Sequence, residues 1–371
     1  MIFSLRTSKR GLLAELNHAV SIPATKSGSA TENYVLLDAS GPQPVLFYTN
    51  LGESFSAPFA GAAEVSGVVA VPLRKLHDYI RLLPEGEMML TASAQDFVLV
   101  TAGRSRTRFP AIPASQYPTH QPAPASALDI DADILGALLR RTQFAVSEDT
   151  SRFAFNGVLL SATSSLLKAV ATNGHRMAYI ETTEFSAQAD FEVLVPRSVI
   201  APVMAIAVSG GAERVRISAD QSSVYFAAGK RQISARRIAG NFPSYQAVLP
   251  VSHSHSLELP RKEFLLTLER TIQFTDARTS AVKFRADRAG LEISASSSDI
   301  GESVEVFESS GPEVEFMDGY RADYISDFLK VIETSSTVSF SFNGSGSAAE
   351  FQPRQHGGSF LYRYIVMPCK I

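Results

Sequence analysis

The sequence predicts an α+β protein made of three repeated domains, each with helices on one face of antiparallel sheets. Two observations support this fold class. Two segments of irregular composition divide the chain into thirds of similar length, and each third contains helix and strand patterns in the same order. We place the three domains at residues 1–118, 126–249 and 255–371.

The dividing segments are rich in residues that interrupt regular structure. Residues 110–124 contain five prolines and show little hydrophobic periodicity. Residues 241–256 contain Pro243 and Pro250, followed by a polar run of Ser and His. Both segments are therefore expected to be linkers between domains.

Each third begins with a short strand and an amphipathic helix. Apolar residues recur three and four positions apart in the three helices, which are expected at residues 12–20, 134–144 and 264–274. The second and third helices also end alike, in Thr142-Gln143-Phe144 and Ile272-Gln273-Phe274.

Paired strands and a second helix follow in each third. The strand patterns cover residues 34–37 and 45–48, 158–160 and 167–171, and 281–284 and 291–294. The second helices are expected near residues 71–83, 195–208 and 320–332, and two of them begin with Val-Pro, a favoured helix start. Further alternating strands end at Phe109-Pro110, Phe242-Pro243 and Met367-Pro368.

The composition is that of a soluble globular protein. Hydrophobic residues make up 45% of the 371 residues, charged residues 19%, and the formal net charge is −3. The one cysteine, Cys369, excludes an intramolecular disulfide and fits a reducing compartment. The sequence shows neither a signal-peptide core nor an apolar run of the roughly 20 residues that span a bilayer. We therefore expect a cytoplasmic protein with no membrane partner.

The expected helices are more basic than the rest of the chain. Together with the residues at their ends, they contain thirteen Lys and Arg against nine Asp and Glu, a net charge of +4, which leaves −7 for the remainder. This contrast favours a helix-lined surface that attracts phosphates, although ordinary solvated helix faces would give a similar count. The sequence has no zinc-finger spacing, no aromatic RNA-binding signature and no Trp. Any nucleic-acid contact should therefore be with the backbone and independent of base sequence.

The stretch around His175 is the strongest candidate for a functional site. The alternating strand pattern over residues 167–171 is followed by Thr172, Asn173-Gly174 supplies residues that tolerate a tight turn, and His175 and Arg176 come next. An enzyme that uses these two side chains is one hypothesis. No nucleophile elbow, P-loop, dinucleotide fingerprint or zinc-type cluster accompanies them, and His253-Ser254-His255 is better explained as a polar linker. We expect no catalytic residue, metal or cofactor.

Several motifs in order resemble those of the bacterial β sliding clamp family, the processivity subunit of DNA polymerase III. The family's Thr-Asp-Gly-His-Arg-Leu is matched by the segment from Thr172 to Met177, with Asn173 in place of Asp. Its Phe-Pro-Asp-Tyr, Arg-Tyr-x-x-Asn-Gly and Met-Pro-Met-Arg-Leu segments are matched at residues 242–245, 152–157 and 367–371. The resemblance covers essentially the whole chain.

The resemblance implies three DNA-clamp domains that form half of a closed ring, completed by a second copy of the chain. The homodimer would encircle double-stranded DNA without sequence preference and bind the DNA polymerase III alpha subunit, the clamp loader and other proteins with a clamp-binding motif. The residues that match DNA-facing positions are Lys26, Arg74, Lys75, Arg81 and Arg197. Those at the implied dimer interface are Arg106, Thr107, Phe109, Ile272 and Phe274.

The resemblance also implies a peptide-binding pocket in the second domain. Its apolar members would hold Leu and Phe side chains of a linear motif, and its polar members would orient the peptide. The matching residues are Arg152, Phe155, Thr172, Gly174, His175, Arg176, Met177, Pro243, Val248, Tyr324, Ile365, Met367, Pro368 and Cys369.

Two regions depart from the family pattern. A polar stretch around Lys26 replaces a Pro- and Leu-rich segment, and Thr107 stands on an edge strand where the family has an apolar residue. A diverged clamp paralogue with an accessory repair or resistance role is therefore a second hypothesis.

Overall fold

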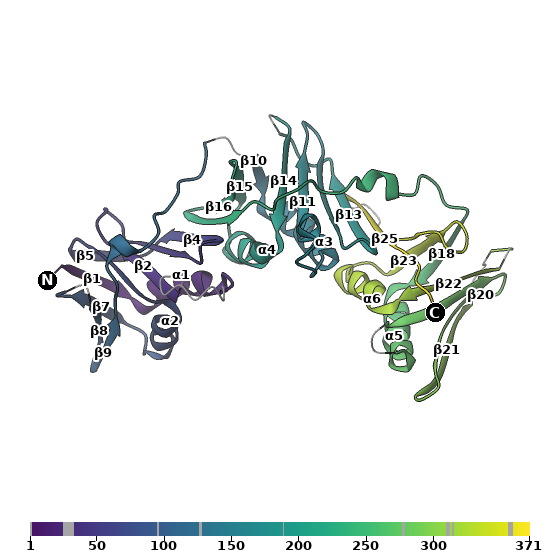
Figure 1. The fold of residues 1–371 in the computed structure, drawn as a ribbon, viewed down its shortest axis with the longest axis horizontal. Helices are drawn as coiled ribbons and strands as arrows, with labels where there is room; N and C mark the ends of the chain where they lie inside the picture. Colours follow the sequence, from purple (N-terminus) through teal and green to yellow (C-terminus); the bar gives the residue numbers. More distant parts are fainter. Residues whose placement is uncertain are drawn as a thin grey trace. The chain divides into compact units, whose positions relative to one another are not determined.

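The computed structural model describes residues 2–24, 33–94, 96–125, 128–187, 189–276, 279–308, 312–313, 315–354 and 359–371. The chain forms two compact units. The first consists of Met1–Gly136 and Val195–Arg237, and the second of Ala137–Leu194 and Ile238–Ile371. We describe each unit by itself (Figure 1).

Six α-helices occupy the six predicted positions among the described residues. They are α1 (Lys9–Ser21), α2 (Leu73–Leu82), α3 (Ala132–Thr142), α4 (Arg197–Met204), α5 (Arg261–Thr271) and α6 (Ala322–Val331). Helices α1 and α2 pack side by side in the first unit, and α5 and α6 do so in the second. The helix pairs thus repeat as the sequence predicts.

The helix starts differ from the prediction in one respect. Pro72 and Pro196 do not occupy the first helical position but cap α2 and α4 from the preceding strands, with φ of −60° and −61°. A strand that runs directly into a helix needs an extended residue at the junction, and the fixed φ of proline is compatible with that conformation. Pro202 lies inside α4, which continues into a π-helical turn at Ala205–Ser209.

The first unit contains two antiparallel sheets. Their orders are β5-β1-β7-β8-β9 and β10-β15-β16-β17-β4-β3-β2-β6. The strands are β1 (Phe3–Ser8), β2 (Tyr34–Asp38), β3 (Val45–Thr49), β4 (Glu53–Pro58), β5 (Gly61–Val65), β6 (Val68–Pro72), β7 (Glu87–Ala92), β8 (Phe97–Ala102), β9 (Ser105–Pro110), β10 (Leu128–Asp131), β15 (Arg214–Ala219), β16 (Ser223–Ala228) and β17 (Arg231–Arg236). The eight-stranded sheet joins strands of the first two sequence thirds where β4 pairs with β17.

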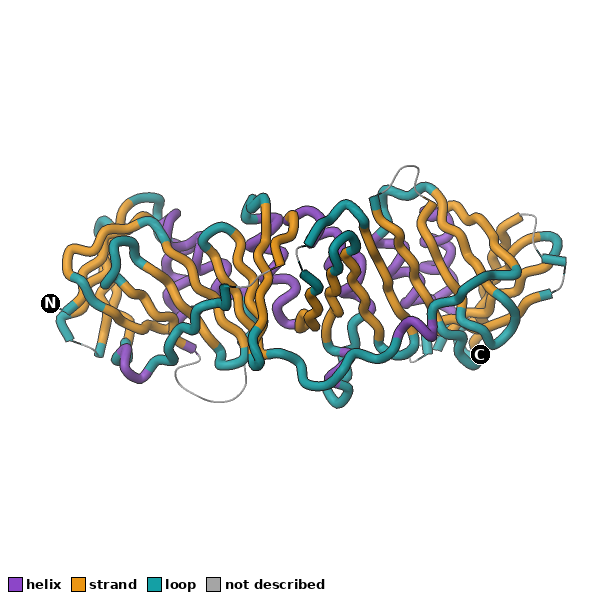
Figure 2. Tube along the Cα trace, turned by 90° about the horizontal axis from the view of Figure 1, so that it is seen from above, coloured by secondary structure: helices purple, strands orange, loops and turns teal. Residues whose placement is uncertain are grey.

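The second unit has the same plan, and strands contribute more residues than helices in both units (Figure 2). Its sheet orders are β14-β11-β12-β13-β25-β24-β23-β18 and β21-β20-β19-β22. The strands are β11 (Gly157–Ala162), β12 (Leu167–Thr172), β13 (Arg176–Thr182), β14 (Phe191–Pro196), β18 (His255–Pro260), β19 (Ala281–Asp287), β20 (Gly290–Ser297), β21 (Gly301–Glu308), β22 (Phe316–Arg321), β23 (Thr337–Phe342), β24 (Ala349–Arg354) and β25 (Phe360–Val366). Here the second and third sequence thirds join where β13 pairs with β25.

Alternation along the strands directs one face of each eight-stranded sheet toward helices. Phe55 of β4 is fully buried and its ring lies 5.8 Å from that of His18 in α1. In the second unit, Tyr364 of β25 stacks on Phe328 of α6 at 4.8 Å between ring centroids. Successive side chains of a strand point to opposite faces, so the neighbours of Phe55 and Tyr364 lie on the face away from these helices. Among the described helices, none is long and apolar enough to cross a bilayer.

Candidate functional site

A pocket of about 290 Å³ lies on this outer sheet face in the second unit, where β13 pairs with β25. Met177 and Ile365 are paired across the two strands, are almost fully buried and belong to one apolar cluster. The lining residues are Phe155, Thr172, Gly174, His175, Arg176, Met177, Pro243, Ser244, Tyr245, Val248, Ile365 and Met367. The pocket is therefore mainly apolar, with a polar edge.

The polar edge is a tight turn between β12 and β13. The carboxamide oxygen of Asn173 accepts hydrogen bonds from the backbone N–H groups of His175 (3.0 Å) and Arg176 (3.1 Å). Thr172 Oγ1 accepts from the Gly174 N–H at 3.0 Å and donates to the Arg176 carbonyl at 2.7 Å. Gly174 has a φ of +90°, which disfavours residues with a side chain. The sequence pattern predicted this turn, and β13 begins directly after it, at Arg176.

Arg176 is held in the protein interior and does not project into solvent. Its Nη1 donates to Asp327 of α6 at 2.7 Å, and its Nη2 donates to the Phe144 carbonyl. The guanidinium also lies over the Tyr324 ring, 4.3 Å from the centroid. Burial alone would lower the pKa of Arg176, but Tyr364 and Asp327 outweigh it, so the pKa is raised. A permanently charged guanidinium held by Asp327 and the Phe144 carbonyl is suited to shaping the pocket and not to transferring protons.

The opposite wall comes from the linker between the second and third sequence thirds. Tyr245 and Val248 belong to a single 3₁₀ turn, and Tyr245 packs on Tyr179 of β13 at 6.0 Å between ring centroids. Val248 and Met367 remain partly exposed at the pocket mouth. The linker is thus a structural part of the pocket.

A buried carboxylate anchors the end of this linker. Glu350 of β24 has no exposed side-chain surface and accepts hydrogen bonds from Arg363 Nε (2.6 Å) and Nη2 (2.7 Å). Arg363 Nη2 also donates to the Pro250 carbonyl at 2.7 Å, and His253 lies 2.8 Å from Glu350. Burial alone would raise the pKa of Glu350, but hydrogen bonds from Arg363, Gln352 and His253 hold it below its usual range. The linker is tied to the sheet through this cluster.

Ten of the fourteen residues predicted for the pocket line it; Arg152, Tyr324, Pro368 and Cys369 do not. Tyr324 lies behind the turn, where its hydroxyl accepts a hydrogen bond from Asn173 at 3.3 Å. Arg152 forms a long ion pair with Asp149 at 3.8 Å. The backbone of Cys369 bonds to Gly319 at 2.8 Å.

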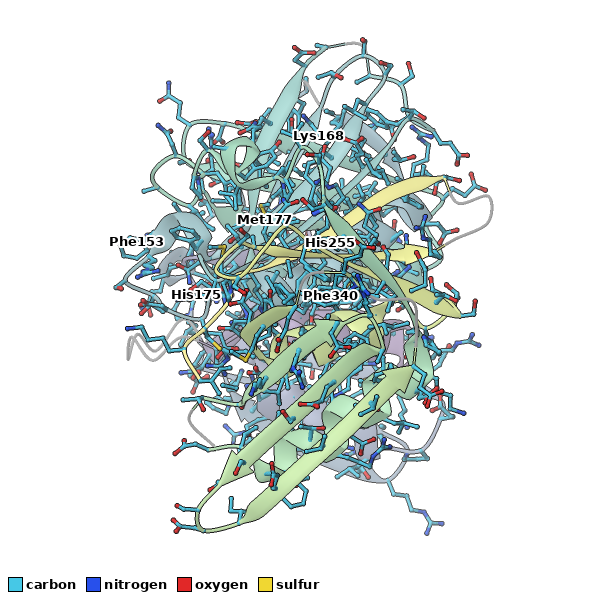
Figure 3. The ribbon with its side chains drawn as sticks, turned by 90° about the vertical axis from the view of Figure 1, so that its right-hand side faces the viewer. Phe153, Lys168, His175, Met177, His255 and Phe340 are labelled. Atoms are coloured by element: carbon cyan, nitrogen blue, oxygen red, sulfur yellow. The ribbon has the colours of Figure 1, made fainter. Side chains whose placement is uncertain are left out.

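The prediction missed two lining residues, Ser244 and Tyr245. Both belong to the Phe242-Pro243-Ser244-Tyr245 motif, so the sequence contained a usable signal for them. Next to the pocket, Phe153 is 63% exposed and projects from the surface near His175 (Figure 3).

The residues predicted to face DNA or a second subunit lie on exposed helices and sheet edges. Arg74, Lys75 and Arg81 are exposed on α2, and Arg197 is exposed at the start of α4. Lys26 falls outside the described residues. Arg106 and Thr107 lie on β9, an edge strand, whereas Phe109 of that strand is buried against Tyr79 of α2. Ile272 and Phe274 form a half-buried 3₁₀ turn after α5.

Among the described residues, no group of three or more His, Cys, Asp and Glu side chains is arranged to hold a metal ion. The candidate site thus offers shape, apolar surface and oriented backbone groups. These features suit the binding of a short peptide with apolar anchor residues.

Comparisons with known proteins agree with this geometry. The family model for the DNA polymerase III beta subunit, central domain, matches residues 129–244, and that for its C-terminal domain matches residues 246–370. The beta sliding clamp of Caulobacter vibrioides is 27% identical, covering 99% of this chain and 100% of that protein. The beta sliding clamp of Pseudomonas aeruginosa is also 27% identical, covering 98% of each chain.

Solved structures show the same fold over the full length. A sliding clamp from Pseudomonas aeruginosa bound to griselimycin superposes with a TM-score of 0.91 at 26% identity, covering 100% of both chains. A DNA polymerase sliding clamp from Bacillus subtilis superposes with a TM-score of 0.92 at 20% identity, again covering 100% of both chains. These matches give no support to an enzyme based on His175 and Arg176 or to a diverged accessory role.

Proposed function

The chain belongs to the DNA polymerase III beta subunit family, the beta sliding clamps, and we propose that it encircles duplex DNA as a homodimer and tethers the replicative polymerase. It is a non-catalytic processivity factor. The observation that carries this proposal is the apolar pocket between β13 and β25, in a chain that matches sliding clamps from end to end. The pocket receives short linear motifs of the polymerase alpha subunit, the clamp loader and other clamp-binding proteins.

A peptide of the Gln-Leu-x-Leu-Phe type should bind this pocket, and Met367→Ala should weaken binding about tenfold. Met367 lies at the mouth, where an anchor side chain would bury it, and a lost apolar contact of this kind costs about 1–2 kcal/mol. Isothermal titration calorimetry measures the affinity. Leu361→Ala, on β25 but outside the pocket, is the matched control and should bind as the wild type does. If the wild-type chain does not bind the peptide, the proposed tethering function is wrong.

DNA contact is assigned to the basic helix α2. Replacing Arg74, Lys75 and Arg81 together with alanine should weaken duplex binding and reduce the slope of log K against log salt by up to about 3, since each phosphate contact contributes about 0.9. Fluorescence anisotropy of a labelled duplex over a salt series measures this. The control removes three exposed cations outside the helices, Arg214, Lys230 and Arg237, and should leave the slope unchanged. Equal slopes for both triple variants would show that α2 is not part of the DNA-binding surface.

The ring closes between two sheet edges of different subunits. The edge strand β9 carries Arg106 and Arg108, and the edge strand β21 carries Glu302 and Glu308. An unpaired strand edge with complementary charge on the partner favours strand addition across an interface. The 3₁₀ turn that contains Ile272 and Phe274 lies beside β21. The Phe274 ring is close to Gly301 at the start of that strand, where an added Cβ would be 3.7 Å from the ring. Circular DNA should retain the closed ring at high salt, and linearisation should release it.

The domain limits at residues 1–118, 126–249 and 255–371 complete the proposal. They are supported by the three successive pairs of helices along the chain and by the linker residues that line a pocket in each unit. A cytoplasmic location is also part of it, because the single cysteine fits a reducing compartment.

A further inference from the structure

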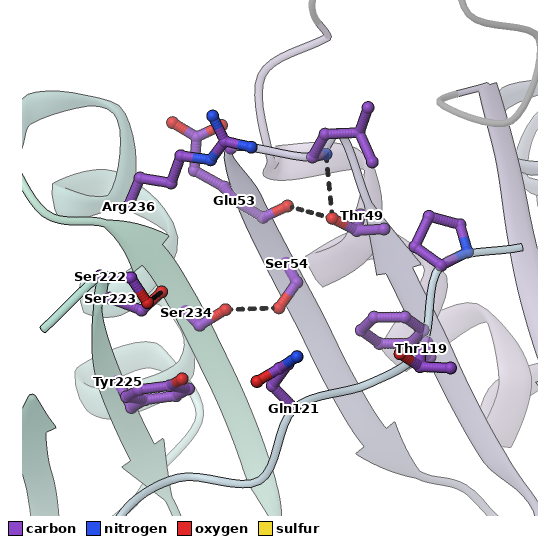
Figure 4. Close-up of a pocket in the computed structure, with 14 residues that line it drawn as sticks. Thr49, Glu53, Ser54, Thr119, Gln121, Ser222, Ser223, Tyr225, Ser234 and Arg236 are labelled. Carbon is purple, nitrogen blue, oxygen red and sulfur yellow. Dashed lines mark hydrogen bonds between the residues drawn. The ribbon is translucent and has the colours of Figure 1, made fainter. Parts of the chain in front are cut away.

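A second pocket, of about 560 Å³, lies in the first unit where β4 pairs with β17 (Figure 4). No role of a sliding clamp described above uses it. Its lining consists mainly of hydroxyl, amide and charged side chains. The residues are Phe47, Thr49, Leu51, Gly52, Glu53, Ser54, Pro118, Thr119, Gln121, Ser222, Ser223, Tyr225, Ser234 and Arg236.

The turn at the edge of this pocket repeats the turn at Thr172–Arg176 bond for bond. Thr49 Oγ1 accepts from the Leu51 N–H at 3.0 Å and donates to the Glu53 carbonyl at 2.9 Å. The Asn50 carboxamide oxygen accepts from the N–H groups of Gly52 (2.9 Å) and Glu53 (2.6 Å). Even the left-handed residue recurs, because Leu51 has a φ of +70° where Gly174 has +90°. The two turns are therefore structural equivalents.

The strand pairing behind the turn is also the same. Ser54 is paired with Ser234 as Met177 is with Ile365. The Arg236 N–H donates to the Gly52 carbonyl at 2.8 Å, just as the Met367 N–H donates to the His175 carbonyl at 2.8 Å. Residues 118–121 of the first linker form a wall, as Pro243 to Val248 of the second linker do in the other unit. The first unit thus contains a second copy of the backbone that forms the peptide pocket.

The side chains of this copy have the opposite chemistry. Three apolar residues of the peptide pocket have polar equivalents here: Ser54 in place of Met177, Ser234 in place of Ile365 and Arg236 in place of Met367. The Ser54 and Ser234 hydroxyls are 2.7 Å apart, and each keeps capacity for a further hydrogen bond. An apolar side chain of a ligand would gain little binding free energy in such a pocket, whereas a polar side chain could form hydrogen bonds with several lining residues.

Arg236 determines the charge of a suitable ligand. Among the described residues, its guanidinium forms no hydrogen bond or ion pair, and neither do the side chains of Thr119 and Gln121. The one lining carboxylate, that of Glu53, is already bound by Ser198 of α4 at 2.6 Å and by Asn50 at 2.5 Å. An unpaired guanidinium beside free hydroxyl and amide groups binds a carboxylate by charge-assisted hydrogen bonds.

We propose that this pocket is a second peptide-binding site, which takes a hydrophilic segment of a partner protein with an Asp or Glu side chain bound to Arg236. The duplicated backbone provides the surface for an extended peptide, and the polar lining selects a sequence class that the first pocket rejects. The choice of a peptide as ligand rests on the proposed function of the first pocket. A partner with both kinds of segment would gain affinity from binding both pockets.

The test uses the full chain and a bead-displayed library of decapeptides randomised over Ser, Thr, Asn, Gln, Asp and Glu. Peptides selected by the wild type should contain Asp or Glu and should bind Arg236→Gln at least about tenfold more weakly, since hydrogen bonds to charged groups are worth about 1.5–3 kcal/mol. Met367→Ala, which impairs only the first pocket, should bind them as the wild type does. Failure to select any peptide, or equal binding to Arg236→Gln, would overturn the proposal.

A grafting experiment tests the equivalence of the two pockets separately. The triple variant Ser54→Met, Ser234→Ile and Arg236→Met should bind two Gln-Leu-x-Leu-Phe peptides per chain in calorimetry, whereas the wild type binds one. One peptide per triple-variant chain would contradict the structural equivalence. A wild type that binds none, yet selects acidic peptides that depend on Arg236, would contradict the proposed function of the first pocket and leave the second site standing.

Discussion

Replacing Arg363 with methionine should destabilise the second unit by about 3–5 kcal/mol at neutral pH, the usual cost of leaving a buried charge without its partner. Glu350 has no exposed side-chain surface, and Arg363 supplies two of its hydrogen bonds. His253 and Gln352 alone would then face the carboxylate. Urea unfolding followed by circular dichroism measures the loss, because the chain has no Trp.

The loss should depend on pH in a specified direction. In the wild type the pKa of Glu350 is depressed, so its contribution is fully present above the pKa of the unfolded chain and disappears as the pH falls through the folded value. In the variant without Arg363, burial raises the pKa of Glu350. Protonation then removes the buried, unpaired negative charge, so it reduces the destabilisation of the variant. The difference in stability should therefore shrink between pH 7 and about pH 4.

A neighbouring ion pair provides the control for this prediction. Arg354 and Glu258 join β24 to β18 through a 2.6 Å contact, but both side chains are well exposed. Arg354→Met should cost less than about 1 kcal/mol, because solvent screens an exposed pair. Equal losses for the two variants, or a loss for Arg363→Met that does not change with pH, would contradict the role assigned to the Glu350 cluster.

The repeated elements of the fold could be predicted because their signals are local. Apolar spacing of three and four predicted the first helix of each third, Val-Pro indicated the start of two of the second helices, and alternation predicted the paired strands. The turn at Asn173-Gly174 was also predictable, because few residues other than Asn and Gly support it. The shared Thr-Asn at residues 49–50 and 172–173 is also visible in the sequence, but the sequence alone does not show that both pairs form the same hydrogen-bonded turn.

What the sequence patterns do not contain is the pairing between thirds. The pockets exist only because β13 pairs with β25 and β4 with β17, and no local pattern specifies which strands meet. The same is true of Arg176 and Asp327, which are 151 residues apart, so no local pattern indicated that Asp327 binds the Arg176 guanidinium. The polar second pocket was missed for this reason.

The double variant Val304→Arg with Val306→Arg should convert the homodimer into monomers, raising the dissociation constant at least about 100-fold. Both valines project from the edge strand β21 and are 52% and 61% exposed in the isolated chain. Burying one Val side chain contributes about 1.5–3 kcal/mol, so losing two exceeds the roughly 2.8 kcal/mol that a 100-fold change requires. The new cations would also face Arg106 and Arg108 of β9 on the partner subunit's edge, adding like-charge repulsion.

The substitutions should leave the fold of the second unit intact, because alternate residues of β21 do the internal packing. Phe307 is buried against Phe264 of α5, and Glu305 pairs with Arg270 at 2.6 Å, so both point away from the face that carries the valines. Val251→Arg places the same new charge on an exposed linker residue and should remain dimeric.

Sedimentation equilibrium distinguishes the outcomes. If the double variant stays dimeric with the wild-type dissociation constant, ring closure uses another surface. If it becomes monomeric, still binds the Gln-Leu-x-Leu-Phe peptide and is no longer retained on circular DNA, then peptide binding resides in the single chain and DNA retention requires the closed ring.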